Sequence, residues 1–539
     1  MRSKKRDLAH LFHNLPSQLI QPSKPFYYGT AGFRGPAKEL SNVVARASLV
    51  AYLRSATFCG KRIGIMITAS HNPASDNGLK FIDHTGDMFD EVWEAICDEI
   101  VNCADKNLLS LLGRVHRKHG NLRELGDGTP AYVVLGRDTR ESGKDLCDII
   151  RSTLCLFNCT VEDYGEVSTP QMHFLIRKSN QQNRLTPKEA YIDHLAECYT
   201  TLSNLNKFTP ELTYIDTANG IAKEQILQLE EKLKLPFTIL NTPGELNYQC
   251  GADYIKSKKA IPVNIVINEP EKITKAVSFD GDVDRLIYFF CIPEIVVIDG
   301  DRICVLLTKY ISELIEKAGI SVSLGVVLSC YSNHSAISYL KKISGVAISV
   351  VNVGVKNFVR KARTFDIGIY FEPNGHGSIN FSAKAVREIE RACGKEESDS
   401  AKILRGFMQI FDPCIGDAMA NFLACECVLP FISLENVAEL YRDYPSRMLA
   451  VRLENKNVLR VNQKNEVIEP PELQANINSL VVKYKGRCLV RPSGTEDLVR
   501  VYAESTKAED CDMLCVKVAQ YVYDLCGGVG RHPEISYVE

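Results

Sequence analysis

Strand-like runs alternate with helix-length segments between residues 275 and 382, and this alternation limits the folds open to the chain. The runs LGVVLSC, VAISVVNV and DIGIYF are rich in β-branched residues, and the segments between them are long enough for helices. A helical spacing of apolar residues precedes them at Ile303, Leu306, Leu307, Tyr310, Ile311 and Leu314. Such alternation is typical of a mostly parallel, doubly wound sheet covered by helices. The middle of the chain is therefore predicted to be α/β.

The rest of the chain divides into further regions of similar character. The runs RIGIMIT, AYVVLG and ELTYIDT each lead directly into a polar loop, which is where open α/β sheets bind ligands. Polar stretches at 178–186 and 452–472 lack any periodicity and are predicted to be linkers or exposed hairpins. A length of 539 residues is enough for three or four domains.

Composition excludes several classes of partner. The 64 Lys and Arg residues nearly balance the 66 Asp and Glu residues, so no overall charge attracts nucleic acid or a membrane surface. No apolar run approaches the ~18 residues of a membrane span, and the basic start MRSKKRD lacks the apolar core of a signal peptide. The 19 cysteines form no CxxC pair, which favours a reducing compartment. We therefore expect a cytoplasmic protein with neither nucleic acid nor a membrane as partner.

The densest acidic cluster is DGDVDR, which lies between the apolar runs AVSF and LIYFF. Its carboxylates, Asp280, Asp282 and Asp284, fall within five residues and repel one another unless a cation neutralises them. An EF-hand would need glycine where this loop has Arg285. Oxygen ligands from only three carboxylates instead suit Mg²⁺, completed by water or phosphate. A solvated acidic turn is the alternative, but such turns seldom lie between runs this apolar.

The motif TASHNP follows the predicted strand IGIMI, so Ser70 is expected at the carboxyl end of that strand. No glycine flanks this serine as in the GxSxG turn of hydrolases, and the adjacent side chains of Ser70 and His71 diverge. Ser70 is thus a better candidate for carrying phosphate than for acyl transfer. Read alone, the motif fits a turn formed by Asn and Pro better than a catalytic role. Lys80 is a candidate acid or base, although an isolated lysine is usually surface charge.

Two further loops offer polar groups for a ligand. RPSGTEDLVR places two guanidinium groups and two hydroxyls around a glycine, as in a phosphate-binding loop. EPNGHGS surrounds two glycines with side chains that suit sugar hydroxyls. An exposed polar turn is the alternative for each of them.

Together, TASHNP, DGDVDR, EPNGHGS and RPSGTEDLVR resemble the loops of the α-D-phosphohexomutases. YGTAGFRG at 28–35 and GRDTRESG at 136–143 extend the resemblance, which spans residues 28 to about 504. It implies an α/β fold of four domains around a central cleft, with three related mixed or parallel-sheet α/β domains and a smaller C-terminal α+β domain. The expected domains are 1–182 with the phosphoserine loop, 183–292 with the metal loop, 293–440 with the sugar loop and 441–539 with the phosphate loop.

The resemblance also implies roles for individual residues. Ser70 would be the phosphoserine, and it would bind Mg²⁺ together with Asp280, Asp282 and Asp284. The catalytic residues would be Ser70, Lys80, His71 and Arg285. The residues implied to bind substrate are Thr30, Arg34, Gly354, Val355, Lys356, Glu372, Asn374, His376, Arg491, Ser493, Gly494, Thr495 and Arg500.

Two details place the chain nearer the branch of this family that acts on acetylamino sugars. Ser70 precedes the GRD loop by over sixty residues, and Asn374 stands where relatives acting on glucose or mannose phosphates usually have serine. The departures are small, with Val283 and Pro373 at positions where alanine is common. Pro373 could alter the pose of the sugar loop and the tolerance for other hexosamines.

The activity implied is interconversion of N-acetylglucosamine 6-phosphate and 1-phosphate in UDP-N-acetylglucosamine biosynthesis. It would proceed through the phosphoserine and a sugar 1,6-bisphosphate, which is both intermediate and activator. The chain is expected to act as a cytoplasmic monomer on a small sugar phosphate. The alternatives are a mutase for glucose or mannose phosphates and a phosphosugar sensor without turnover, against which the intact Ser70, Lys80 and three aspartates argue.

Overall fold

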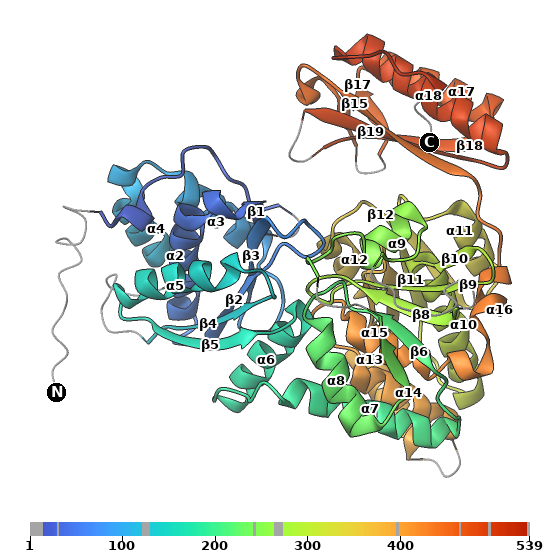
Figure 1. The fold of residues 1–539 in the computed structure, drawn as a ribbon, viewed down its shortest axis with the longest axis horizontal. Coiled ribbons are helices and arrows are strands. Elements are labelled where there is room, and N and C mark those ends of the chain that lie inside the picture. Colours follow the sequence, from blue (N-terminus) through green and yellow to red (C-terminus); the bar gives the residue numbers. More distant parts are fainter. Residues whose placement is uncertain are drawn as a thin grey trace.

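Four larger β-sheets and one two-stranded sheet form the protein, which was analysed as a computed structural model (Figure 1). The structure describes residues 15–29, 32–120, 130–240, 244–263, 273–394, 398–462, 465–493 and 497–535. Each larger sheet is the centre of one structural unit, and the units follow one another along the chain.

The first unit is a five-stranded mixed sheet in the order β1-β3-β2-β4-β5. Its strands are β1 (Phe33–Pro36), β2 (Arg62–Ile67), β3 (Asp76–Ile82), β4 (Tyr132–Arg137) and β5 (Thr160–Glu166). Its helices are α2 (Ser41–Thr57), α3 (Glu91–Asn102), α4 (Leu108–Gly120) and α5 (Ser142–Cys155). Strands β2, β4 and β5 are parallel, whereas β3 is antiparallel to both β1 and β2. Helix α2 is almost entirely buried and is the centre of this unit's core.

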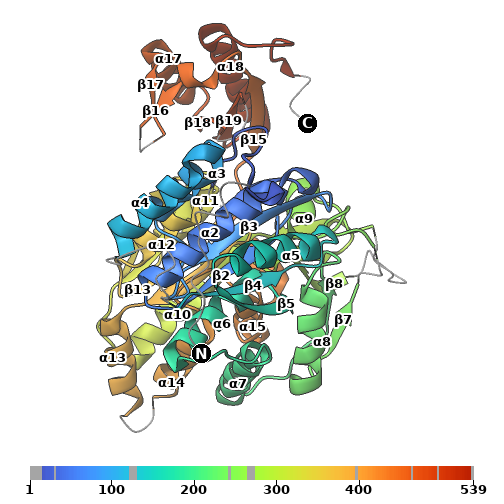
Figure 2. The same ribbon diagram turned by 90° about the vertical axis from the view of Figure 1, so that its left-hand side faces the viewer.

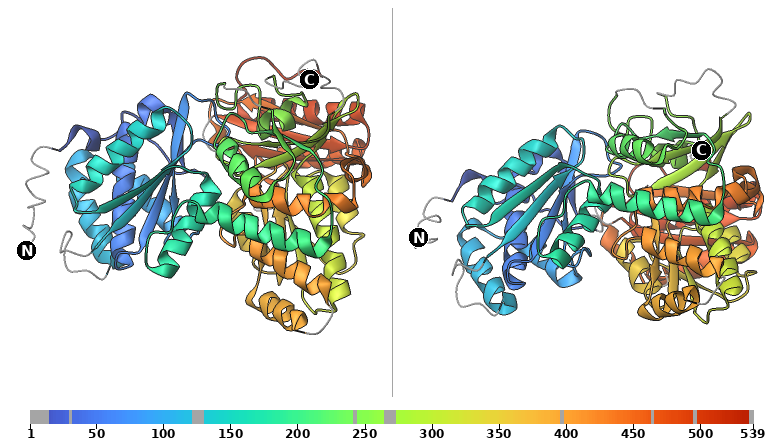
Figure 3. Two further views of the ribbon diagram at one scale, coloured as in Figure 1. Left: turned by 60° about the horizontal axis from the view of Figure 1, so that its bottom comes forward. Right: turned by 90° about the horizontal axis from the view of Figure 1, so that it is seen from below.

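The second unit has the strand order β10-β9-β8-β6-β7. Its strands are β6 (Thr213–Asp216), β7 (Phe237–Ile239), β8 (Ile273–Phe279), β9 (Leu286–Cys291) and β10 (Ile295–Ile298). Helices α6 (Thr169–Gln182) and α7 (Ala190–Asn206) lead into it, and α8 (Ala222–Leu233) and α9 (Ala252–Lys258) lie within it. Figure 3 shows α6 and α7 running from the first unit along the others.

The third unit has the strand order β12-β11-β13-β14. Its strands are β11 (Leu324–Ser329), β12 (Val346–Val351), β13 (Ile367–Phe371) and β14 (Gly377–Phe381). Its helices are α10 (Gly300–Ala318), α11 (His334–Leu340), α12 (Val355–Ala362), α13 (Ala383–Cys393), α14 (Asp399–Ile410), α15 (Ala418–Glu426) and α16 (Leu434–Glu439). One hydrophobic cluster runs through the second and third units, whereas the first and fourth units have cores of their own.

The predicted parallel pairing is confirmed for β11, β12 and β13 but does not extend to the strands before them. Strands β8, β9 and β10 form antiparallel pairs and belong to a different sheet from β11 and β13. The physical reason is connection length: only short loops separate β8, β9 and β10, and a parallel pair needs a crossover of a dozen or more residues. The strands and the helix that the sequence predicted in this region are nevertheless all present.

The fourth unit is smaller and has the sheet order β15-β19-β18. It comprises β15 (Ser446–Arg452), β16 (Arg460–Val461), β17 (Val467–Glu469), α17 (Pro471–Lys483), β18 (Gly486–Pro492), β19 (Leu498–Ser505) and α18 (Ala508–Cys526). Figures 1 and 2 show α17 and α18 on the face of this sheet that points away from the other units. Three α/β units followed by a small α+β unit confirm the predicted fold class.

The predicted domain boundaries stay predictions, with one adjustment that the sheet suggests. A boundary after residue 292 would separate β10 from β9, its hydrogen-bonded neighbour. We propose that the second domain ends after Ile298, which keeps this sheet whole. Within the part of the chain that the structure describes, none of the helices combines the length and apolar character needed to span a membrane.

Helix α6 joins the first unit to the third through buried polar contacts. His173 is 1% exposed, and its Nδ1 lies 2.6 Å from the carbonyl oxygen of Gly86. On the same helix, the Arg177 guanidinium donates to the Asp412 carboxylate at 2.5 Å. Burial lowers the pKa of His173 to about 4, so the folded protein holds this imidazole neutral over most of the pH range.

We expect the free energy of unfolding of His173→Asn to fall less than that of the wild-type chain as the pH drops from 7 to 4. Below the ordinary histidine pKa the unfolded chain binds a proton that folded His173 refuses until about pH 4, so the free energy of unfolding falls as the pH drops through this window. The wild-type chain should lose up to about 3 kcal/mol more than the variant between pH 7 and pH 4. Denaturant unfolding at several pH values measures this difference, and equal slopes for the two chains would contradict the expectation.

Candidate active site

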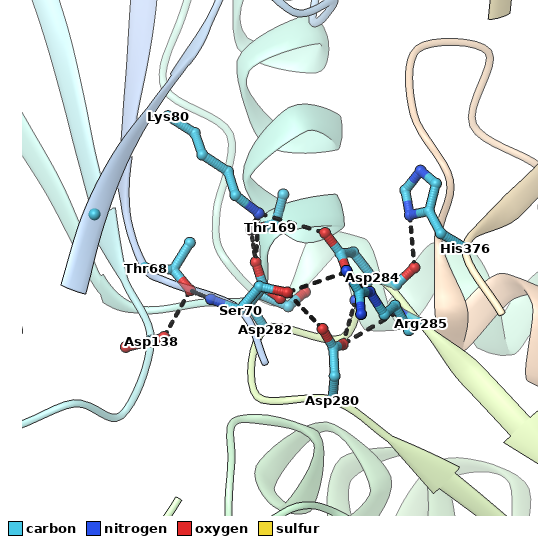
Figure 4. Close-up of polar contacts among 12 residues, drawn as sticks. Thr68, Ser70, Lys80, Asp138, Thr169, Asp280, Asp282, Asp284, Arg285 and His376 are labelled. Atoms are coloured by element: carbon cyan, nitrogen blue, oxygen red, sulfur yellow. Dashed lines mark hydrogen bonds and ion pairs between the residues drawn. The ribbon is translucent and has the colours of Figure 1, made fainter. Parts of the chain in front are cut away.

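Ser70 is buried in the turn after β2, where several polar groups fix its backbone. Its φ of 53° lies in the left-handed region that serine seldom adopts, and its exposed fraction is 0%. Its amide donates to Thr68 Oγ1 at 2.9 Å, and the Thr68 hydroxyl donates to Asp138 Oδ2 at 2.6 Å. The Ser70 hydroxyl donates to Asp280 Oδ2 at 2.6 Å, so the serine points directly at the metal loop of the second unit (Figure 4).

Arg140 holds the whole serine loop. Its guanidinium donates to the carbonyl oxygens of Ser70 and Asn72, both at 2.9 Å, and to those of Pro73 and Asp76. Its Nε also donates to Asp138 at 3.0 Å, and the side chain is only 3% exposed. Since one planar group bonds four carbonyls of one turn, Arg140 keeps the strained conformation of Ser70 in place.

The metal loop connects β8 to β9 and brings three carboxylates together. One oxygen from each of Asp280, Asp282 and Asp284 lies within 4.8 Å of the others. Val283 is fully buried with a φ of 64°, which turns the chain so that the acidic side chains on either side converge. Gly281 permits the close approach to the serine loop, because a Cβ there would lie 2.7 Å from the Ser70 carbonyl oxygen.

Lys80 reaches the same carboxylates from β3. Its ammonium donates to Asp282 Oδ2 at 2.7 Å and to Asp284 Oδ2 at 3.4 Å, and the Thr169 hydroxyl donates to Asp282 Oδ2 at 2.6 Å. Burial opposes the charge of this lysine, but Asp282 and Asp284 outweigh burial and raise the pKa of Lys80. The side chain is therefore a fixed positive charge and a poor proton acceptor.

The three carboxylates differ in how readily they ionise. Burial, with the charges of Asp284 and Asp282, raises the pKa of Asp280 well above its ordinary value. Burial acts in the same direction on the other two carboxyls, but Lys80 outweighs it and lowers the pKa of both Asp282 and Asp284. A cation between the three groups would remove the repulsion that helps to raise the pKa of Asp280.

The donor set fits a divalent metal ion. The Asp282 Oδ1 atom is buried and makes no hydrogen bond to any residue that the structure describes. A buried carboxylate oxygen without a partner is costly unless a cation binds it. With the Ser70 hydroxyl beside Asp280, the site offers only oxygen ligands, as Mg²⁺ prefers.

Three more predicted residues surround this centre. Arg285 Nε lies 3.9 Å from Asp284 Oδ1, and its guanidinium also donates to Asp253. Burial lowers the pKa of Arg34, although the charges of Asp282 and Asp284 act to raise it. Burial, reinforced by Arg285 and Arg34, lowers the pKa of His71 to about 3, so this imidazole is neutral at physiological pH.

The predicted sugar loop connects β13 to β14 and packs on the metal loop. His376 Nδ1 lies 2.8 Å from the Asp284 carbonyl oxygen, and the His376 amide donates to Asn374 Oδ1 at 3.0 Å. Gly375 has a φ of 90°, and a Cβ there would lie 2.0 Å from the Leu286 carbonyl oxygen, so only glycine fits. Burial acts to lower the pKa of Arg285, but Asp284, Asp280 and Asp253 raise it, and Glu372 adds a smaller effect in the same direction.

The remaining predicted residues lie outside this cluster. Gly354 caps α12, and the ammonium of Lys356 on its first turn lies 2.5 Å from Glu94 Oε1 of the first unit. Arg491 and Arg500 face each other on β18 and β19 of the fourth unit. Ser493 follows β18 and donates its amide to the Leu498 carbonyl at 2.8 Å. Three predicted residues fall outside the described part of the chain: Thr30, Gly494 and Thr495.

Sequence reasoning missed several residues that shape the site. Asp138 and Arg140 lie in GRDTRESG, which was recognised as a family loop but given no role. Thr169 at the start of α6 bonds Asp282, and the Asn247 side chain donates to the Ser70 carbonyl at 2.8 Å. Nothing in the residues around Thr169 or Asn247 marks them as partners of a serine or metal loop.

Comparison with known proteins identifies the family of this chain. Residues 299–433 match the family model described as "Phosphoacetylglucosamine mutase AMG1, domain III". Residues 42–107 and 111–186 match the phosphoglucomutase/phosphomannomutase alpha/beta/alpha domain I, and residues 448–520 match the C-terminal domain of the same group. A "probable phosphoacetylglucosamine mutase" of Encephalitozoon cuniculi is 49% identical over 526 residues, which cover 96% of this chain and 98% of the relative. The chain belongs to the phosphoacetylglucosamine mutase family.

Other members of the phosphoacetylglucosamine mutase family are similar over the same length. The enzyme of Sus scrofa is 35% identical, with 97% of this chain and 98% of the relative covered. A crystal structure of Aspergillus fumigatus N-acetylphosphoglucosamine mutase with GlcNAc-6P and magnesium is 33% identical and has a TM-score of 0.88, covering 95% of this chain and 98% of that one. A variant of the same enzyme in complex with glucose 1,6-bisphosphate has a TM-score of 0.86 at 33% identity, covering 94% and 97% of the two chains.

Proposed function

We propose that this chain interconverts N-acetylglucosamine 6-phosphate and N-acetylglucosamine 1-phosphate through a phosphoserine at Ser70. The observation that carries the proposal is the Ser70 hydroxyl, buried and 2.6 Å from a carboxylate of the three-aspartate metal loop. The family's solved complexes, with GlcNAc-6P and magnesium and with glucose 1,6-bisphosphate, contain the substrate and the kind of intermediate that this route requires.

The reaction consists of two phosphoryl transfers in opposite directions, the first from Ser70 to the sugar and the second from the sugar back to Ser70. In the first, the O1 hydroxyl of the 6-phosphate attacks the phosphoserine, so an O1–P bond forms and the bond from Ser70 Oγ to phosphorus breaks. The sugar hydroxyl loses its proton, and the freed Ser70 oxygen gains one, so Ser70 is left as a neutral hydroxyl. The resulting 1,6-bisphosphate reverses its orientation, and Ser70 Oγ then takes the phosphoryl group from O6, which leaves the 1-phosphate and restores the phosphoserine.

The cations around Ser70 stabilise the charge of the moving phosphoryl group. When bound by Asp280, Asp282 and Asp284, Mg²⁺ supplies a Lewis acid that neutralises the phosphoryl oxygens. Lys80 stays protonated, so we propose that it acts through its charge and not as a proton acceptor. Arg285 and Arg34 add positive charge on the same side, whereas neutral His71 offers only hydrogen bonds to a phosphoryl group.

Substrate recognition is divided between two loops in this proposal. Glu372, Asn374 and His376 would bind the sugar hydroxyls beside the metal loop, and Gly354, Val355 and Lys356 would approach the sugar from α12. The cross-strand pair of Arg491 and Arg500, with Ser493, would bind the phosphate that is not being transferred. Thr30, Gly494 and Thr495 would complete the phosphate contacts, as the family resemblance implies.

The purified chain with Mg²⁺ and a trace of glucose 1,6-bisphosphate should convert N-acetylglucosamine 6-phosphate to the 1-phosphate. Phosphorus NMR measures this conversion. Glucose 6-phosphate and mannose 6-phosphate, tested in parallel, should react more slowly. Faster turnover of either hexose phosphate would favour the corresponding mutase instead. Binding without any turnover would favour a phosphosugar sensor and contradict the proposal.

Arg491→Ala should raise KM for the 6-phosphate and the 1-phosphate by similar factors, about tenfold each. The reason is that the intermediate reverses, so one phosphate site must accept a phosphate attached at either end of the sugar. Glu372→Ala serves as the matched comparison, because contacts to hydroxyls should make its effect depend on which hexose is supplied. A large rise in KM for one phosphate isomer alone would show that Arg491 serves only one orientation.

We further propose that the enzyme works as a cytoplasmic monomer. All 19 cysteines are free thiols, which suits a reducing compartment. Light scattering of the purified protein measures the oligomeric state.

A further inference from the structure

Helices α3 and α12 belong to different units, and each turns a charged face toward the other. Helix α3 is fixed in the first unit by Trp93, Ile96 and Cys97, whose exposed fractions are 7% or less. Helix α12 is fixed on the third unit's sheet by Phe358 and Ala362, which are both fully buried. Because their apolar faces are held by separate cores, neither helix can turn freely to satisfy its charges.

Three ion pairs connect the α3 region to α12, and we name them the charge zipper. They are Lys356 with Glu94 at 2.5 Å, Arg360 with Glu91 at 2.6 Å and Arg363 with Asp87 at 2.6 Å. Along the chain, the basic residues 356, 360 and 363 are spaced four and then three apart. Their partners 94, 91 and 87 run in the opposite chain direction and are spaced three and then four apart. Lys356 and Arg360 lie one turn apart on α12, and Glu91 and Glu94 lie one turn apart on α3, so these two pairs form a matched contact between two units. Asp87 and Arg363 lie just outside the two helices and add the third pair.

The three pairs of the zipper are not equivalent. The side chains of Arg360 and Glu91 are 67% and 72% exposed, and exposed pairs of this kind contribute little stability. The side chains of Lys356 and Glu94 are only 25% and 21% exposed. Burial raises the pKa of Glu94 even though Lys356 acts to lower it, so this carboxylate is held in a partly desolvated place. The pair that includes the predicted sugar contact is therefore the most buried.

The opposite end of the zipper is anchored. Arg363 also donates to the Pro413 carbonyl at 2.9 Å. In the same region, Gly86 leaves no room for a side chain, because a Cβ there would lie 2.8 Å from Arg177 Cβ of α6 and 3.3 Å from Cys414 Sγ of the third unit. This close packing fixes the first unit against the third at Asp87, and the zipper continues from that joint along α12 to Lys356.

We propose that Glu94 is a positioning residue, which holds the Lys356 ammonium at the start of α12 so that it meets the sugar phosphate in register with Ser70. The ion pair of Glu94 and Lys356 connects the two parts of the site. Helix α3 belongs to the same unit as Ser70 and Lys80, whereas Lys356 belongs to the unit of the sugar loop. Without Glu94 the lysine side chain would sample many rotamers and would have to be ordered by the substrate. The inference rests on the proposed function, since it assigns Lys356 to substrate binding.

Glu94→Gln keeps the shape of the side chain and removes its charge. We expect KM for N-acetylglucosamine 6-phosphate to rise about tenfold while kcat changes less than about twofold, as for loss of a contact made equally in ground and transition states. The matched control is Glu99→Gln on the same helix, whose ion pair with Arg114 at 2.8 Å lies within the first unit and is exposed. The control should leave both constants unchanged, and unchanged KM in Glu94→Gln would overturn the proposal.

Charge exchange separates positioning from simple docking of the two units. Combining Glu91→Arg with Arg360→Glu should restore wild-type kinetics, because that pair serves docking only. Combining Glu94→Lys with Lys356→Glu restores the ion pair but moves the ammonium to the wrong helix, so KM should stay high. Full recovery of KM in this second exchange would overturn the positioning role.

Direct binding distinguishes failure of this inference from failure of the proposed function. Calorimetry with N-acetylglucosamine 6-phosphate should show about tenfold weaker binding to Glu94→Gln than to the wild-type chain, whether or not turnover occurs. Equal affinities with normal wild-type turnover would overturn only the role of Glu94. A wild-type chain that neither binds nor converts this sugar phosphate would overturn both proposals.

Discussion

Ser70→Ala should lower the mutase turnover number by at least about 10,000-fold, because no second nucleophile stands in its place. The neighbouring groups in this turn are backbone carbonyls already bonded to Arg140, and His71 has its pKa lowered to about 3. The variant should still fold, since alanine fits the space and Arg140 keeps the turn. Turnover is measured with N-acetylglucosamine 6-phosphate, and folding by thermal unfolding.

Ser75→Ala is the matched control for this change. Ser75 lies five residues further along the same loop and is exposed, so its hydroxyl should not affect turnover. Intact mass spectrometry adds a second readout, since the wild-type chain incubated with glucose 1,6-bisphosphate should gain one phosphate and Ser70→Ala none. Retention of normal turnover by the folded Ser70→Ala chain would rule out the phosphoserine route.

The sequence predicted this region well because the chemistry there is local. Asp280, Asp282 and Asp284 are close in the chain, so their repulsion, and the need for a cation, follows from composition and spacing alone. The strands on either side are apolar and β-branched, and the structure has β8 and β9 at those positions. The contact between Ser70 and Asp280 could not be predicted from spacing, because 210 residues separate them. Only the family resemblance put the two loops in one site.

The features that could not be predicted from the sequence depend on contacts between units. The charge zipper is an example: Glu94 reads as an ordinary exposed residue of an amphipathic helix, and Lys356 as part of a sugar loop, until the fold places them 2.5 Å apart. Arg140 is similar, since its four carbonyl acceptors are backbone atoms that carry no sequence signal. The antiparallel pairing of β8, β9 and β10 could have been predicted, because the short connections between these runs leave no room for the crossover that a parallel pair needs.

These features together explain how one strained serine can be kept ready for reaction. Gly281 and Ser70 bring two loops into backbone contact, and the cost of the left-handed φ at Ser70 is offset by the Arg140 hydrogen bonds. The position of the nucleophile is therefore set by rigid elements of two units. Most of the proposed substrate contacts, by contrast, lie on the third and fourth units, so we expect binding and chemistry to be separable by substitution.

Asp282→Asn should lower kcat by about 100- to 1000-fold, with a smaller change in sugar affinity. The substitution keeps the shape of the side chain but removes one ligand charge, and it also removes the charge that Lys80 pairs with at 2.7 Å. The first change weakens the binding of Mg²⁺, and the second removes the charge that most raises the pKa of Lys80, so less positive charge is held beside the phosphoryl group. Stopped assays over a range of Mg²⁺ concentrations should show that the variant needs more Mg²⁺ than the wild-type chain to reach half of its maximal activity.

Thr169→Val is the control that isolates the metal effect. It removes the other hydrogen bond to Asp282 Oδ2, at 2.6 Å, but leaves all three carboxylates and Lys80 in place, so its effect on kcat should be less than about tenfold. Treatment of the wild-type chain with EDTA should reproduce the loss seen in Asp282→Asn, and added Mg²⁺ should restore activity to the wild-type chain alone. Full activity of the metal-free enzyme would mean that the three buried carboxylates have a structural role and that Lys80 and Arg285 alone neutralise the transferred group.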